Sequence, residues 1–199
     1  SFRDFVDRKT IFFAPVVKWN VSPRTQITAE MEYHNINTKS DGLLPALGNR
    51  PAPIPISRYL DEPSFSKSAN ERFFTGLNWS HEFNDDWKIT HRLSGEFIHG
   101  RGHREIVPFS SVQPDGTVQR FLADVPPGQQ ENRYQSSLNL IGHFDTGMVK
   151  HTLLFGYDFL YQTDKYSVAK CCDTDPASNF PINVFNPVYG LGIPSLDQI

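Results

Sequence analysis

The strongest constraint on the fold is a stretch in which two runs of residues alternate in polarity on either side of a short turn. The stretch extends from Tyr134 to Gln162, and its turn occupies residues 145–150. Because side chains alternate between the two faces of a strand, each run predicts a strand with one apolar and one more polar face. Gly147 lies in the turn, where a hairpin needs a glycine. The stretch is therefore predicted to be one long β-hairpin, and its apolar face needs a partner or an apolar solvent.

The same alternation predicts further strands over residues 4–20, 25–36, 71–83 and 87–99. Pro15 weakens the first of these, because a proline donates no hydrogen bond to a neighbouring strand. No apolar repeat with the 3.6-residue period of a helix appears, so no long helix is expected. The chain is predicted to be all-β, with about six antiparallel strands in up-and-down order.

The connections between these strands alternate strictly in length. Short turns lie near Ser22, Asp85 and Gly147, and long loops lie near Pro53, Asp115 and Cys172. The first long loop, residues 37–70, is predicted to be too irregular for a buried element, and the second, residues 100–131, to be a long polar segment. In an up-and-down sheet this order puts all short turns on one rim and all long loops on the other. Outer-membrane barrels sort their loops in this way, with short periplasmic turns and long extracellular loops, whereas soluble sandwiches and lipocalins rarely do. The loop order favours a segment of a transmembrane β-barrel.

The charge pattern agrees with a barrel but also suits a soluble sandwich. The central parts of the apolar faces carry no charged residue, and a Lys or Arg facing lipid there costs about 2–4 kcal/mol. Large aromatic residues lie near strand ends, where the interfacial rows of a membrane barrel belong. These aromatic residues are Trp19, Tyr33, Trp79, Trp87 and Tyr134, and the charges of the opposite faces are Lys18, Glu30, Glu32, Glu82, Lys88, Arg92, Glu96 and Asp158.

Composition excludes several classes of protein. The formal net charge of the 199 residues is −3, so the chain lacks the excess of positive charge that attracts nucleic acid. No apolar run is long enough for a membrane helix. The only two cysteines, Cys171 and Cys172, are adjacent; they fit neither a disulfide scaffold nor a zinc site, and free thiols are expected. The chain begins at Ser1 without a signal peptide, so we expect a fragment of a longer protein.

Six short motifs, taken in order, resemble TonB-dependent siderophore receptors, above all those of the ferrichrome and hydroxamate type. The resemblance covers nearly the whole chain. The motifs lie at Phe12–Trp19, Ser22–Thr25, Leu47–Pro63, His81–Asp85, His151–Phe159 and Phe185–Gly190.

This resemblance implies a 22-stranded barrel of the bacterial outer membrane that surrounds a plug domain. Residues 1–199 would be one part of the barrel wall, without the plug and the remaining strands, and would not fold stably alone. The implied function is uptake of a ferric siderophore, energised by the TonB–ExbB–ExbD complex through the missing N-terminal part. The expected partners are the siderophore–iron chelate and outer-membrane lipid, and no cofactor is expected.

A siderophore site needs aromatic and cationic groups on the loop rim, because iron chelates offer flat or oxygen-rich surfaces. The predicted ligand-binding residues are Arg50, Arg58, Tyr59, Arg101, Arg104, Phe109 and Tyr166. No nucleophile motif or phosphate-binding loop is found, so no enzyme, no catalytic residue and no metal site is predicted. Two alternatives remain open: a general porin with the same barrel physics, and a soluble β-sandwich that binds carbohydrate.

Overall fold

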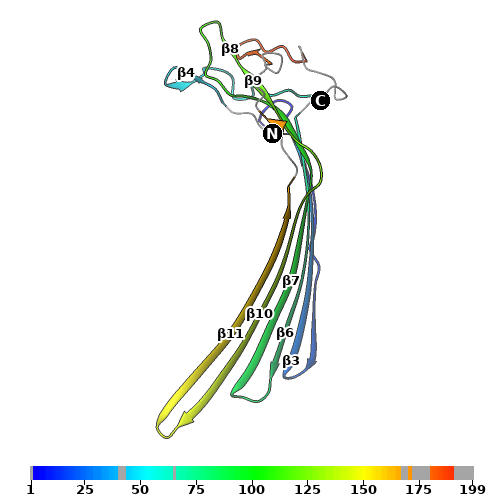
Figure 1. Ribbon diagram of the computed structural model, residues 1–199, viewed down its shortest axis with the longest axis vertical. Helices are drawn as coiled ribbons and strands as arrows, with labels where there is room; N and C mark the ends of the chain where they lie inside the picture. The colour runs from blue at the N-terminus through cyan, green and yellow to red at the C-terminus, as the bar shows by residue number, and fades with distance from the viewer. Residues whose placement is uncertain (1, 40–43, 65, 167–169, 172–179, 191–199) are drawn as a thin grey trace.

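One antiparallel β-sheet forms the body of the computed structural model (Figure 1). The structure describes residues 2–39, 44–64, 66–166, 170–171 and 180–190. Neighbouring strands of the sheet are neighbours in sequence, in the order β1-β3-β6-β7-β10-β11, and β2 also pairs with β3. The long elements are β1 (Arg8–Phe13), β2 (Val16–Ser22), β3 (Thr25–Thr38), β6 (Lys67–Glu82), β7 (Trp87–Pro108), β10 (Gln129–Thr146) and β11 (Val149–Lys165).

Short strands occur in the long connections. They are β4 (Ala46–Leu47), β5 (Arg50–Pro51), β8 (Thr117–Val118), β9 (Arg120–Val125), β12 (Lys170–Cys171) and β13 (Ile182–Asn183). The part of the chain that the structure describes contains no helix, so none there could cross a membrane. The predicted all-β, antiparallel, up-and-down arrangement is confirmed. No second sheet covers the apolar face within the described residues, which separates this architecture from the sandwich alternative.

Pro15 interrupts the first strand without changing its register. Phe13 pairs with Tyr33 in β1 and Val16 pairs with Glu30 in β2, so the same number of residues lies between the pairs on both strands. The carbonyl of Pro15 still accepts a hydrogen bond from the Met31 backbone nitrogen at 3.1 Å. Since only the missing N–H is lost, the proline splits one strand into β1 and β2, and both pair with β3 alone.

Short turns and long loops lie at opposite ends of the sheet (Figure 1). The hairpin of β10 and β11 closes between Thr146 and Val149, so its turn is shorter than the predicted one. Gly147 has a φ of 63° and Met148 is not among the residues with positive φ, which is the pattern of a type II′ turn. The side chain of Asn84 holds the second turn by accepting from the backbone of Asp86 and Trp87, at 3.0 and 2.8 Å.

The apolar face of the sheet ends in an aromatic row at each rim. Toward the long loops, Phe73 packs on Phe97, Phe97 on Tyr134 and Tyr134 on Tyr161, with ring centroids 5.6–6.3 Å apart. Phe13 and Tyr33 continue this upper row by strand register. The lower row, toward the short turns, consists of Phe83, Trp87, Phe144 and His151, and Trp19 and Trp79 lie close to the same rim.

The two aromatic rows are separated by one constant interval. On four strands the upper and lower aromatic residues are ten positions apart: 73 and 83, 97 and 87, 134 and 144, 161 and 151. Ten residues span about 33 Å along a strand. At the usual tilt of barrel strands, this is about 25 Å along the membrane normal, the height of the apolar band of an outer-membrane barrel. The spacing of the rows fits a wall that crosses a bilayer.

Two predictions about the loops are wrong. Residues 100–131 were expected to form a polar loop, but β7 extends to Pro108 and pairs with β9 after a bulge next to Gly102, whose φ is 102°. Residues 37–70 were expected to be too irregular to be buried, but Ala52, Tyr59 and Leu60 are buried. The reason is that the long loops pack against one another, through contacts that local sequence patterns do not reveal.

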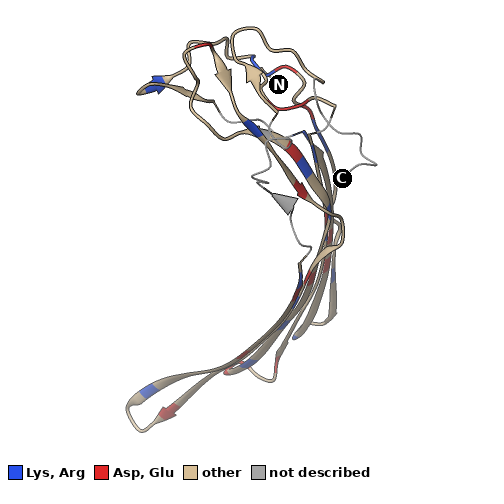
Figure 2. Cartoon of the chain, turned by 45° about the horizontal axis from the view of Figure 1, so that its top comes forward, with Lys and Arg blue, Asp and Glu red and all other residues tan. Residues whose placement is uncertain are grey.

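We call the packed loop segments 44–64, 109–125 and 180–190 the loop layer. Its core combines residues from all three segments; these residues are Ala52, Leu60, Val112, Val118, Ile182 and Val184. A smaller cluster joins Phe180 to Ile106 and Leu122. In Figure 2 the wall is a curved sheet and the loop layer leans toward its concave side. The side chain of Cys171 and the whole of Cys172 lie outside the described residues, so the expectation of free thiols lies outside them too.

Candidate functional site

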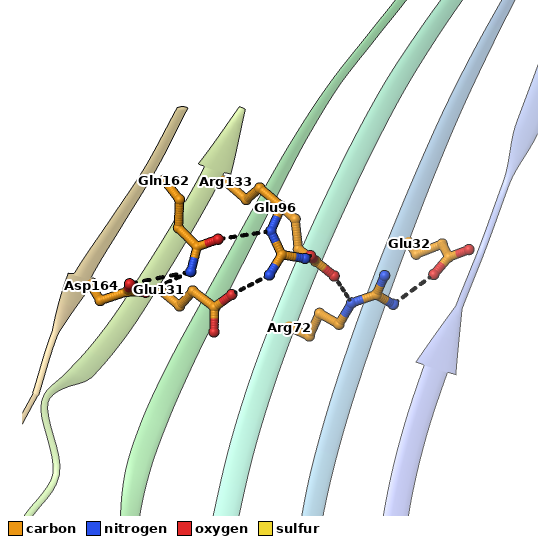
Figure 3. Close-up of polar contacts among 7 residues, drawn as sticks. All are labelled: Glu32, Arg72, Glu96, Glu131, Arg133, Gln162 and Asp164. Atoms are coloured by element: carbon orange, nitrogen blue, oxygen red, sulfur yellow. Dashed lines mark hydrogen bonds and ion pairs between the residues drawn. The ribbon is translucent and has the colours of Figure 1, made fainter. Parts of the chain in front are cut away.

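The polar face of the sheet carries charged side chains that bridge neighbouring strands (Figure 3). Arg72 on β6 binds Glu32 on β3 at 2.9 Å and Glu96 on β7 at 2.5 Å. Arg133 on β10 binds the second oxygen of Glu96 at 2.9 Å and Glu131 at 2.6 Å. We call this chain of contacts the charge ladder. Glu96 stands at its centre and joins the two arginines.

The charge ladder continues to β11 through amide and carboxylate groups. Arg133 donates to the Oε1 atom of Gln162 at 3.3 Å, and Gln162 donates to Asp164 at 3.1 Å. Three carboxylates share the two guanidinium groups, and Asp164 adds a fourth negative charge, so the row carries more negative than positive charge. The arginines are more than a third exposed. The row can offer hydrogen-bond acceptors to a group that lies against the polar face.

A small pocket lies at the loop end of the polar face, next to the charge ladder. Its volume is about 120 Å³, and Glu131, Asp164 and Tyr166 are among its lining residues. Tyr166 is 78% exposed. An aromatic ring beside two carboxylates could contact a flat or cationic group. The pocket is smaller than the usual 300–1,000 Å³ of a drug-sized ligand site.

The loop layer above the wall encloses a charged pair. Arg120 is 1% exposed and Glu62 is 2% exposed, with 3.9 Å between Nη1 and Oε2. Arg120 donates to the carbonyls of Phe180 at 2.7 Å and Leu60 at 3.1 Å. Burial lowers the pKa of the Arg120 guanidinium, and the nearby Glu62 carboxylate opposes this shift. One arginine thus connects the three segments of the loop layer.

Aromatic rings close the loop layer beside this pair. Phe5 packs against Tyr59 and Tyr189, with ring centroids 5.9 and 5.5 Å apart. The Tyr189 hydroxyl donates to the carbonyl of Tyr59 at 2.7 Å. Burial raises the pKa of the Tyr59 hydroxyl. Phe5 has a φ of 62°, so it adopts a left-handed conformation that is costly for a bulky residue.

The predicted ligand-binding residues do not converge on one cleft. Arg50 is exposed in β5, Arg58 is half-buried, and Phe109 packs against Phe121 with its ring half exposed. Tyr59 is 1% exposed, so the loop layer covers the ring that was expected to meet a ligand. Tyr166 alone lines the pocket beside the charge ladder.

Arg101 and Arg104 are brought together. Both line a second pocket of about 360 Å³ beside the bulge at Gly102. Arg104 binds the carboxylate of Asp124 with two hydrogen bonds of 2.9 and 2.8 Å. Arg101 instead donates hydrogen bonds to the side chains of Asn35 and Asn37. These two asparagines lie on the same side of the sheet as the apolar face.

Sequence reasoning placed Glu32 and Glu96 on the polar face but missed the ladder they form with Arg72 and Arg133. The alternation of β6 and β10 could have put both arginines on this face. Their partners follow only from strand register, in which Phe74 lies opposite Glu96 and Glu96 lies opposite Arg133. No group of three metal-ligating side chains occurs among the residues that were described.

Comparison with known proteins gives matches along nearly the whole chain. The chain is 27% identical to the metal-pseudopaline receptor CntO of Pseudomonas aeruginosa strain PAO1, over 96% of its own length and 26% of that protein. CntO of strain UCBPP-PA14 matches with the same identity and coverage. No protein-family model matches the chain.

Two solved structures share the fold at low sequence identity. The siderophore receptor PiuA from Acinetobacter baumannii superimposes with a TM-score of 0.76 at 17% identity, over 94% of this chain and 30% of that one. BauA, the ferric preacinetobactin receptor from the same species, gives 0.74 at 14% identity, over 96% and 28%. These matches are receptors and not enzymes, as expected here. The chain spans about a quarter of the curated relatives and has the fold of a section of the siderophore-receptor sheet.

Proposed function

We propose that this chain is a section of the wall of an outer-membrane receptor that takes up a metal chelate. The observation that carries the proposal is the two-faced sheet with a packed loop layer at one rim, in a chain 27% identical to the receptor CntO. The apolar face would meet lipid between its aromatic rows, and the polar face would line the barrel interior. The rest of the 22-stranded barrel and the plug would come from other parts of the full protein.

In this proposal the loop layer captures the chelate and the wall holds the loops in place. Exposed side chains on the loop rim, such as Arg50 and Tyr166, are available for a first contact. The charge ladder ties five strands together at the level where a ligand would enter the barrel. Energy for release would come from the TonB–ExbB–ExbD complex, acting through the plug.

The ligand class is proposed more broadly than the sequence resemblance implied. A ferric hydroxamate is one version of the proposal. The similarity to a metal-pseudopaline receptor supports a second version, in which the ligand is a metal–pseudopaline chelate. Both versions need the same wall, and they differ in the loop residues that touch the chelate.

The test is metal uptake by cells that carry or lack the full-length gene. Under metal limitation, deletion should abolish uptake of one radiolabelled chelate from a panel of ferric siderophores and other metal chelates, and a plasmid copy should restore it. Uncoupling the inner-membrane proton gradient should abolish the same uptake. If deletion instead lowered passive entry of many small solutes and left every chelate unaffected, the porin alternative would replace the proposal.

A further inference from the structure

Two carboxylates stand side by side at the loop end of the polar face. Glu131 on β10 lies directly opposite Asp164 on β11 in the register, and Figure 3 shows the two side chains next to each other. Like charges in directly opposite positions destabilise a sheet. Arg133 binds Glu131, whereas among the described residues the only side chain that donates to Asp164 is the neutral amide of Gln162. This corner of the sheet therefore has one carboxylate more than its cations bind.

Apolar and aromatic groups also line the small pocket beside these carboxylates. Ile98 on β7 lies opposite Glu131, so it belongs to the polar face although its side chain is apolar. Tyr166 follows Asp164 at the two-residue period and is 78% exposed. Lys165 lines the pocket as well, but it alternates to the other face of β11. The pocket thus combines negative charge, an apolar side chain and an exposed aromatic ring.

The same imbalance of charge extends over the polar face from the charge ladder to the middle of the sheet. On β3 to β11, this part of the face carries six carboxylates and three guanidinium groups. The carboxylates are Glu30, Glu32, Glu96, Glu131, Asp158 and Asp164, and the guanidinium groups are Arg72, Arg92 and Arg133. A concave surface lined by charges of one sign attracts ligands of the opposite sign and repels ligands of the same sign. A chelate that approaches this face is therefore favoured if it carries positive charge.

We infer that the receptor selects a chelate with a protonated primary amine on an alkyl arm, and that this pocket binds the arm. The ammonium group donates to the carboxylates of Glu131 and Asp164. The alkyl part lies against Ile98, and the ring of Tyr166 faces the cation. A pocket of about 120 Å³ admits such an arm and excludes the body of the chelate. The inference rests on the proposed function, since it names the class of chelate that the receptor takes up.

The test repeats the uptake assay in cells that carry the full-length gene, with every chelate of the panel prepared in two forms. One form carries a free primary amine on an alkyl arm, and in the other form the amine is acetylated and has no charge. At low concentration, the wild-type receptor should take up the free amine about tenfold faster than the acetylated form of the same chelate, because hydrogen bonds between charged groups are the strong ones.

Variants of the pocket should lower this preference. Glu131→Gln/Asp164→Asn removes both carboxylates with little change in size and should leave a preference of less than about twofold. Asp164→Asn alone, which keeps every ion pair of the charge ladder, and Tyr166→Leu, which removes the ring, should each lower it about threefold. The matched control Glu30→Gln/Asp158→Asn removes two carboxylates nearer the middle of the same face and should stay within about twofold of the wild type.

The outcomes separate this inference from the proposed function. If no chelate enters in either form, the proposed function fails and the inference fails with it. If a chelate enters and acetylation does not slow it, uptake stands and the inference is overturned. A preference that survives in the pocket variants, or that both double variants lose equally, overturns it as well. Selective loss in the pocket variants, with unchanged uptake of the acetylated form, supports the site.

Discussion

The wall and the loop layer are stabilised in opposite ways. In the wall, the long strands pair along most of their length, but large side chains of the apolar face such as Phe155 and Phe159 remain 60% and 48% exposed. In the loop layer, regular structure is sparse, but Val118, Val184 and Arg120 are at most 1% exposed. The closely packed core of this chain therefore lies in its loops and not in its sheet.

This difference indicates which solvent each region requires. The apolar face can gain free energy only from lipid or another apolar phase, because the described chain has nothing that covers it. The loop layer buries its own apolar groups and can remain folded in water, as the extracellular position in our proposal requires. The two regions should therefore respond separately to mutations, and the predictions below test that separation.

The largest effect is expected from removing the arginine at the centre of the loop layer. Arg120→Leu leaves the Glu62 carboxylate buried without its cation and frees two carbonyls. Breaking a buried pair in this way costs about 3–5 kcal/mol. Hydrogen exchange of the full-length protein should show faster exchange at Leu60 and Val118 but unchanged exchange at Leu140 in the wall.

The double variant Arg120→Leu/Glu62→Gln is the control for this prediction. It removes both charges, so most of the lost protection should return. If exchange in β10 rises together with exchange in the loop layer, the two regions unfold as one unit and their separation is wrong.

The next effect concerns the apolar face of the wall. Leu140 lies on this face opposite Phe155, and its neighbour Asn139 lies on the polar face. Leu140→Arg should destabilise the protein in bilayers by about 2–4 kcal/mol, whereas Asn139→Arg should have a small effect. Urea unfolding in vesicles measures both. Equal losses in the two variants would mean that lipid does not distinguish the faces.

A smaller difference is expected between glycines on the two faces. At Gly142, an added methyl group would collide with the ring of Trp87 on the apolar face. At Gly76, it would meet the Glu30 side chain, 2.5 Å from its carboxylate oxygen, and that chain can turn away. Gly142→Ala should cost about 1–3 kcal/mol and Gly76→Ala less, in the same urea experiment. The Trp87 fluorescence should also shift in Gly142→Ala; an unchanged spectrum would contradict the collision.

Local patterns in the sequence were sufficient to predict most of the wall, apart from the extension of β7 to Pro108. A period of two residues identifies each strand and its two faces, and the short turns at Pro23, Asp85 and Gly147 pair the strands. The loop layer could not be predicted in this way. Its contacts join residues far apart in sequence, such as Tyr189 and Tyr59, which are separated by 130 positions.

The same distinction explains the result for the candidate site. Glu96 was placed on the polar face correctly because alternation is local. The prediction that Tyr59 meets a ligand assumed that loop residues are exposed, and the packing of three segments removes that exposure. The position of Arg101 depends on the bulge beside Gly102 and on two asparagines of another strand, neither of which has a local signature.

The smallest effect is expected in the charge ladder, where the groups are partly solvated. Glu96→Gln removes the carboxylate that joins Arg72 and Arg133, but the two arginines are 36% and 40% exposed, so water compensates much of the loss. The cost should be about 1 kcal/mol in low salt and less in high salt, because salt screens exposed charges. Lys88→Gln, which breaks the isolated pair with Glu82, should cost less still. An equal, salt-independent loss in both variants would show that the ladder is no stronger than a single surface pair.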